Sequence, residues 1–404
     1  MNNAINYLIV ILILATACSP SKSKEKNISN STLINLPTNS GSSLPYLMVG
    51  ADNFLYLSWV EKSTDTTQLL FSKFDGSEWS EAEQIASGTN WFVNWADYPM
   101  MSSLKNGTLI AHYFAKNAAG TYSYDVNLVT KSDQDWSDNF IPHDDGTPTE
   151  HGFVTMLPLT DSTFQVTWLD GRNTGGGDHS SHTGGAMTLR TAIINSNGSV
   201  SEDTELDDRT CDCCQTGGAM TSQGPIIVYR DRSELEIRDI SIVRKVNGKW
   251  TNPENIASDL WNIAGCPVNG PRADAQGDNL VVAWYSAANS KPMVKVVFSG
   301  DAGASFMSPI TVDDQMPMGR VDVAMIDERA AVVSWLTMDG KRSVIMARKV
   351  NKNGTTESPV IIAETSDSKG SGFPQLAYFK GDFYAAWTSM EEDITQVKMA
   401  KISL

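Results

Sequence analysis

Residues 279–284 read NLVVAW, and apolar runs that end in an aromatic side chain recur along the whole chain. The other six are FLYLSW at 54–59, TLIAHYF at 108–114, FQVTW at 164–168, PIIVY at 225–229, AAVVSW at 330–335 and DFYAAW at 382–387. They repeat about every 55 residues, and a fixed period of this length is typical of repeat proteins. Each run is short, rich in β-branched residues and bounded by Gly, Asn, Asp or Pro, so each predicts a β-strand.

Every run lies inside a larger unit of several predicted strands. A strand-like segment precedes it, a β-branched segment follows it, and a short fourth strand closes most units. Seven such units predict an all-β fold, a β-propeller with seven four-stranded blades. The seventh unit ends after its third strand, and the free segment 32–36 can supply the fourth strand and close the ring. The alternative is two stacked sandwiches of three and four units.

Composition limits the possible functions. The chain has 404 residues, 41% of them hydrophobic, and a net charge of −16. This hydrophobic fraction is ordinary for a folded protein and excludes a wholly disordered chain. Nucleic acid is not an expected partner, because phosphate binding needs a basic face.

The N-terminus predicts export and a lipid anchor. Residues 7–17 form an apolar run that is too short to span a bilayer, and such a run at the start of a chain is typical of a secretory signal. The segment LATAC at 14–18 resembles the lipobox of bacterial lipoproteins, which implies that Cys18 is acylated, as with palmitate, and becomes the new N-terminus. An ordinary signal peptide with a chance cysteine is the alternative.

We therefore divide the chain into a signal peptide at 1–17, a polar tether at 18–31 and a propeller at 32–404. Ser19 after the lipidated cysteine favours the outer membrane of the cell envelope, with the periplasmic and surface faces both open. Membrane lipid is thus one expected partner.

One turn resembles a known family motif. The segment SGDAGASF at 299–306 looks like the Asp-box of sialidase-type and other BNR-repeat propellers. Its motif positions are Ser299, Asp301, Gly303, Ser305 and Phe306. The aspartate accepts hydrogen bonds from turn amides and the glycine allows a positive φ, so the motif is structural and not catalytic.

A broader resemblance covers residues 150–323. The segments TEHGF (149–153), WLDGR (168–172), DDRTCDCCQT (207–216) and GCPVNGP (265–271) resemble a bacterial sialidase-like group that has no settled activity. Sialidases hydrolyse sialic acid glycosides with an arginine triad, a Tyr–Glu nucleophile pair and an Asp acid/base. Their first arginine lies in the first blade, where this chain reads SLPYL at 43–47 and has none.

Candidate site residues fall in the loops that surround one mouth of a propeller channel. These loops join the fourth strand to the next blade, and the second strand to the third. The candidate acid/base residues are Asp97, Glu150 and Asp170, with Tyr229 as a possible nucleophile. The candidate ligand-binding residues are Arg172, Arg230, Arg232, Arg272, Arg320, Trp91, Trp95, His151 and Asn269. Arginines suit an anionic ligand, or they pair with neighbouring acids, and the tryptophans stack on sugars or pack in the core.

Four cysteines remain after Cys18: Cys211, Cys213, Cys214 and Cys266. Outside the cytoplasm four cysteines usually form two disulfides, and a bridge from Cys211 or Cys214 to Cys266 would tie adjacent blades. Alternatively, the cluster binds copper or zinc, with His151, His179 or His182 as further ligands, or some thiols stay free.

Three functions compete at this stage. The first is binding of a glycan, a protein or another anionic ligand on the loop-bearing face. The second is hydrolysis by a sialidase-like exo-glycosidase, and the third is a metal or redox module built on the cysteines. We favour binding, because the first-blade arginine is missing and no nucleophile pair is recognisable.

Overall fold

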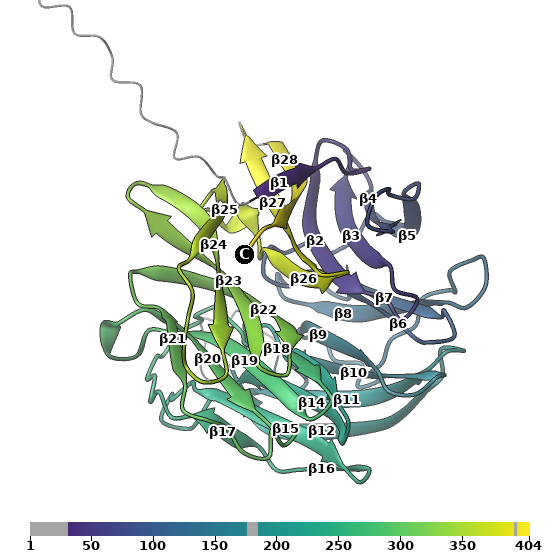
Figure 1. Ribbon diagram of the computed structural model, residues 1–404. Helices are drawn as coiled ribbons and strands as arrows, with labels where there is room; N and C mark the ends of the chain where they lie inside the picture. Colours follow the sequence, from purple (N-terminus) through teal and green to yellow (C-terminus); the bar gives the residue numbers. More distant parts are fainter. Residues whose placement is uncertain (1–30, 176–184, 392–393) are drawn as a thin grey trace, which may run out of the picture.

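The computed structural model describes residues 31–175, 185–391 and 394–404, and Figure 1 shows their strands arranged in sheets around a centre. Apart from two short 3-10 helices, Ala288–Ser290 and Lys369–Ser371, the regular structure of these residues is β. None of their helices has the length and apolar character needed to cross a membrane.

The strands follow the chain in seven consecutive groups. Blade 1 contains β2 (Ser42–Val49), β3 (Leu55–Lys62), β4 (Thr67–Phe74) and β5 (Glu83–Gly88), and blade 2 contains β6 (Met101–Ser103), β7 (Leu109–Lys116) and β8 (Tyr124–Lys131). Blade 3 contains β9 (His151–Pro158), β10 (Thr163–Asp170), β11 (Met187–Asn195) and β12 (Val200–Thr210). Blade 4 contains β13 (Gly217–Thr221), β14 (Gly224–Arg230), β15 (Ile240–Val246), β16 (Lys249–Trp250) and β17 (Glu254–Ala257).

The remaining three blades repeat the four-strand pattern. Blade 5 contains β18 (Arg272–Gln276), β19 (Asn279–Ser286), β20 (Met293–Ser299) and β21 (Ile310–Asp313). Blade 6 contains β22 (Pro317–Asp327), β23 (Ala330–Asp339), β24 (Arg342–Asn351) and β25 (Val360–Thr365). Blade 7 contains β26 (Gln375–Phe379), β27 (Asp382–Glu391), β28 (Ile394–Ile402) and β1 (Ser31–Ile34).

The predicted seven-bladed propeller is confirmed. The innermost strand of each blade contacts the innermost strand of the next, and β26 contacts β2, so the ring is closed. This continuous ring excludes the alternative of two stacked sandwiches. In blade 2 the position of the fourth strand is held by an isolated bridge between Leu128 and Phe140.

The N-terminal segment closes the ring, as the sequence predicts. Strand β1 pairs antiparallel with β28, from Ser31 opposite Ile402 to Ile34 opposite Met399. Figure 1 shows the first strand lying beside the last one, at the junction of the two chain ends. We expected residues 32–36, and the observed strand begins one residue earlier and ends two residues earlier.

The repeated tryptophans explain why the second strand of a blade is so recognisable. Four of these side chains are almost wholly buried between blades, and each indole N–H donates a hydrogen bond of 2.6–2.8 Å to a carboxylate. The pairs are Trp59–Glu61, Trp168–Asp170, Trp284–Asp259 and Trp335–Asp313. Burying an indole is stabilising only if its N–H finds an acceptor, so each tryptophan comes with an acid.

The segment that resembles an Asp-box forms a hydrogen-bonded turn between β20 and β21. Oδ1 of Asp301 accepts hydrogen bonds from the hydroxyl of Ser299 (2.7 Å) and the amide of Ser305 (2.9 Å), and Gly303 has a φ of +78°. Phe306 packs against the apolar core that blades 4 and 5 share. The turn therefore stabilises the blade, at the end opposite the fourth-to-first loops.

Candidate functional site

Three of the predicted acid/base residues lie at the boundary between blades 2 and 3. Asp97 precedes β6, Glu150 precedes β9, and Asp170 is the last residue of β10. These positions belong to the fourth-to-first and second-to-third loops, so the predicted face of the propeller does gather them. Tyr229 lies in blade 4, and its buried hydroxyl donates to Asp207, so the structure does not bring it together with the other three.

Asp97 and Glu150 share one buried tyrosine. The hydroxyl of Tyr124 lies 2.8 Å from Oδ2 of Asp97 and 2.6 Å from Oε1 of Glu150. The other oxygen of Asp97 accepts the amide of Phe153 at 2.8 Å. Burial, opposed by the hydrogen bonds from Tyr124 and Phe153, raises the pKa of Asp97 well above its ordinary value.

This Asp97–Tyr124–Glu150 network is closed to substrate. Asp97, Tyr124 and Glu150 are 3%, 0% and 6% exposed. A Cβ added at Gly152 would lie 2.0 Å from Oδ2 of Asp97. Only a glycine allows the chain to pass this close to the carboxylate. The network therefore fastens blade 3 to blade 2, and we assign it a structural role.

A second cluster is built around His151, the residue that follows Glu150. The imidazoles of His143 and His151 stack with their centroids 3.8 Å apart and their planes 10° from parallel. Nε2 of His151 lies 3.0 Å from Oδ2 of Asp145, and its Nδ1 lies 3.4 Å from Oδ1 of Asp125. Asp170 is 3.7 Å from His151 and binds Arg172 through two hydrogen bonds of 2.8 Å.

Acidic and basic side chains of this cluster partly offset one another. Although burial favours the neutral imidazole, Asp125 and Asp145 raise the pKa of His151 to about 9. Burial and the neighbouring His151 lower the pKa of His143 to about 4, so one ring of the stack is charged at neutral pH. Asp125, His143 and His151 have ligand atoms within 4.8 Å of one another, as do Asp145, His151 and Asp170. A cation there would compete with protonated His151 and with Arg172.

Four of the five predicted arginines are held by the protein itself. Arg172 is paired with Asp170, and Arg232 binds Glu236 and Asp212. Arg230 donates to the carbonyls of Asn269, Arg238 and Tyr285, and Arg320 donates to carbonyls of residues 367, 368 and 372 and to the Ser371 hydroxyl. These side chains therefore stabilise loops.

Arg272 differs from the other four because it lines the central channel. The channel is a cavity of about 390 Å³ formed by residues from the innermost strands, among them Tyr46, Asp274 and Asp322. Nε of Arg272 donates to Asp322 at 3.1 Å and Nη2 donates to Gln375 at 3.1 Å. Its Nη1 group makes no hydrogen bond within the described residues.

The aromatic and amide candidates pack against their neighbours. Trp91 stacks on Tyr113 with the ring centroids 4.2 Å apart, and Trp95 stacks on Phe373 at 5.7 Å. Oδ1 of Asn269 accepts the amide of Arg320 at 2.6 Å. The structure therefore gives these residues a packing or loop-holding role.

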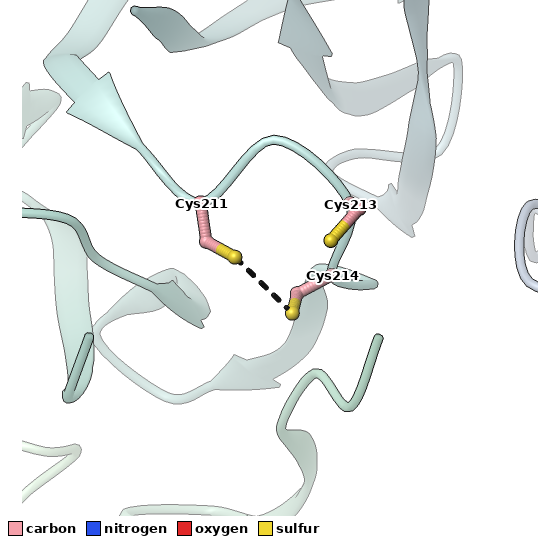
Figure 2. Close-up of side chains that lie close together, drawn as sticks. All are labelled: Cys211, Cys213 and Cys214. Carbon is pink, nitrogen blue, oxygen red and sulfur yellow. Dashed lines mark hydrogen bonds between the residues drawn. The ribbon is translucent and has the colours of Figure 1, made fainter. Parts of the chain in front are cut away.

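None of the four described cysteines forms a disulfide in this structure, so the predicted bridge to Cys266 is not formed. Cys211, Cys213 and Cys214 nevertheless converge, as Figure 2 shows, and Sγ of Cys211 lies 3.4 Å from Sγ of Cys214. Two of the possible extra ligands, His179 and His182, lie outside the described residues, as does the lipidation site Cys18.

Sequence reasoning missed several members of these clusters. Tyr124 and Asp125 begin β8, and His143 and Asp145 lie in the loop before β9. His143 and Asp145 belong to a fourth-to-first loop, and Tyr124 and Asp125 directly follow a second-to-third loop, so position near these loops was a usable signal. What the sequence lacked was the partner of each side chain across the blade boundary.

Comparison with known proteins supports the fold. No known protein-family description and no curated sequence matches the chain. Among solved structures, a protein of unknown function from Dyadobacter fermentans is similar over 93% of this chain and 98% of its own, with 11% identity and a TM-score of 0.54.

Two further structures have named activities. The phage phi92 endosialidase has 10% identity and a TM-score of 0.51, over 93% of this chain and 69% of its own. The polysaccharide lyase Uly1 has 10% identity and a TM-score of 0.51, over 95% of this chain and 94% of its own. Identities this low show a shared fold alone, so the chain is a seven-bladed propeller with a sialidase-like fold. Membership of an Asp-box family stays a prediction.

Proposed function

We propose that this protein binds glycans at the mouth of its central channel, with Arg272 as the residue that recognises an acidic group on the sugar. The observation that carries this proposal is the position of Arg272, which lines the channel with Nη1 open while the other four arginines are held by loops. A guanidinium donates strong, directional hydrogen bonds to carboxylates and sulfates. The endosialidase and the polysaccharide lyase act on glycans with a similar fold, which supports the ligand class.

Binding is favoured over hydrolysis because of burial. A glycosidase needs two carboxyl groups that reach the sugar from opposite sides. Asp97 and Glu150 are buried on either side of the Tyr124 hydroxyl, and Asp170 is buried and bonded to Arg172 and Trp168. None of these three predicted acid/base residues is open to a ligand.

Replacing Arg272 with lysine should weaken binding of an acidic oligosaccharide at least tenfold. Lysine keeps a positive charge beside Asp322 but loses the planar fork, and a charge-assisted hydrogen bond contributes about 1.5–3 kcal/mol. Calorimetric titration with sialyllactose and with an oligo-uronate measures this, with lactose as the neutral comparison.

The matched control is Arg190→Lys, since Arg190 also pairs with two carboxylates but lies on the outer strand pair of blade 3. Equal affinity for both variants, at equal thermal stability, would contradict the proposal. Release of free sugar during the titration would instead support the hydrolase alternative.

We also propose that the propeller is held at the outer membrane by an acylated Cys18, which the segment LATAC supports. Cys18→Ser should abolish labelling by a fatty-acid probe and move the protein from the membrane to the soluble fraction, because the acyl chains supply the anchor. Ser19→Ala is the control and should keep both properties. An unlabelled wild-type protein, or membrane fractionation that does not change in Cys18→Ser, argues against the anchor.

A further inference from the structure

The four described cysteines come from equivalent loops of two successive blades. Cys211, Cys213 and Cys214 lie in the loop between β12 and β13, and Cys266 lies in the loop between β17 and β18. The sulfur atoms of the first three all lie within 4.8 Å of one another. Cys266 reaches this group through its thiol, which interacts with that of Cys213. The fold thus brings three thiols together and places that of Cys266 beside Cys213 at their edge, and we call these four residues the thiol cluster.

The spacing of the sulfur atoms fits a shared ion better than a covalent bond. Sulfurs that bind one Zn²⁺ tetrahedrally at about 2.3 Å lie roughly 3.8 Å apart. Bonded sulfurs lie about 2.05 Å apart. The distance of 3.4 Å between Cys211 and Cys214 is closer to the first value, and Figure 2 shows Cys213 near the same pair.

Two buried guanidinium groups accompany the thiol cluster. Nη1 of Arg238 donates to Sγ of Cys211 at 3.2 Å, and the amide of Cys211 donates to the carbonyl of Arg230. Arg230 is almost fully buried, and within the described residues it makes no ion pair with a carboxylate. A buried charge without a counter-ion lowers the stability of the fold, so an anionic neighbour of Arg230 would be stabilising.

The charge of a metal–thiolate complex meets this requirement. Zn²⁺ with four thiolates and Cu⁺ with three thiolates both carry a net charge of −2, which would give Arg230 an anionic neighbour and add to the ion pair that Arg238 makes with Glu236. Hydrogen bonds from N–H groups to ligating sulfurs are a usual outer shell of such sites. A disulfide carries no charge and would leave Arg230 without a counter-ion, whereas Arg238 would keep its ion pair with Glu236.

We propose that the thiol cluster binds one thiophilic d10 metal ion, either Zn²⁺ through all four cysteines or Cu⁺ through Cys211, Cys213 and Cys214. Each ligating thiol releases its proton to water as it binds. The ion would fasten the loop before blade 4 to the loop before blade 5, next to the carbonyls that hold Arg230. This role is separate from glycan binding in the channel.

The test uses the full-length protein, purified under reducing conditions and stripped of metal. Added Zn²⁺ or Cu⁺ alone should bind in a ratio of about one per chain, measured by mass spectrometry of the metal content. The bound ion should also raise the unfolding temperature, since a ligand of the native state stabilises it. Less than a tenth of an equivalent of both ions would overturn the proposal. So would two disulfides in protein purified without a reductant, seen as a mass four hydrogens lighter with no titratable thiol at Cys211, Cys213, Cys214 or Cys266.

Two variants identify the ligands. Cys213→Ser should lower the affinity for the bound ion by tenfold or more, whereas Cys266→Ser should do so for Zn²⁺ and leave Cu⁺ binding unchanged. Ala264→Ser is the matched control, because it places a new hydroxyl two residues from Cys266 without removing a thiol. Equal metal affinity in Cys213→Ser and Ala264→Ser would refute the site. The wild-type titration decides the question even if a cysteine variant fails to fold.

Discussion

A chain that lacks residues 31–34 should lose about 5 kcal/mol of stability and unfold at a temperature lower by roughly 5 °C or more. Strand β1 is the outer strand of blade 7 and pairs with the last four residues of β28, from Met399 to Ile402. The loss includes several backbone hydrogen bonds at about 1 kcal/mol each, and the partial burial of Ile34 in the core of blades 1 and 7. It also includes the bond of 2.8 Å from the Ser31 hydroxyl to the Ile362 carbonyl of blade 6.

Differential scanning calorimetry should compare this chain, starting at residue 35, with one that starts at residue 19 and keeps β1. Light scattering should accompany it, because an unpaired β28 offers an open edge that favours association. Ile34→Ala is a milder variant and should cost about 1–2 kcal/mol without opening the edge. Equal unfolding temperatures for the two chain lengths would show that the ring does not depend on this strand.

Lowering the pH from 7 to 5 should cost the protein about 2 kcal/mol through one buried histidine, His112. The side chain is wholly buried in blade 2, and its Nε2 accepts the amide of Met100 at 3.0 Å. Burial lowers the pKa of His112 from 6.5 to about 3. The unfolded chain therefore binds a proton below pH 6.5 that the folded chain does not, so stability is complete above pH 6.5 and falls as the pH decreases. The full loss, reached near pH 3, is about 5 kcal/mol.

His112→Gln removes the titration and offers an amide oxygen to the same backbone N–H. Urea unfolding at pH 7, 6 and 5 should give a shallower decline of the free energy of unfolding for this variant than for the wild type. The difference in slope isolates His112 from the other titrating groups, among them His143, whose pKa is also lowered, and His151, whose pKa is raised. Parallel pH profiles of variant and wild type would contradict the assignment.

Much of the candidate face was predictable because loop class fixes it. In a propeller the fourth-to-first and second-to-third loops all open on one side, so Asp97, Glu150 and Asp170 could be placed together once the strands were counted. Their roles were not predictable. Whether Glu150 meets a substrate or the hydroxyl of Tyr124 depends on a contact across a blade boundary, between residues 26 positions apart.

The partners of the arginines were not predictable from the sequence either. From the sequence, Arg172, Arg230, Arg232, Arg272 and Arg320 were equal candidates for an anionic ligand. The structure separates them, because four bind acids or carbonyls of their own or a neighbouring loop while Arg272 reaches the channel from the start of β18. A guanidinium can satisfy several acceptors at once, and the sequence does not say which acceptors lie within its reach.

The sequence by itself determined the number of blades, the strand that closes the ring and the turn around Asp301. Each follows from a local rule: a period of apolar runs, an unpaired strand at the chain end, or a short hydrogen-bonded motif. The tertiary structure alone decided which polar side chains are buried and bonded within the protein and which face a ligand. Burial makes an unpaired polar group costly, so Asp97, Glu150 and Arg230 bind partners from other segments of the chain, which become neighbours only when adjacent blades pack together.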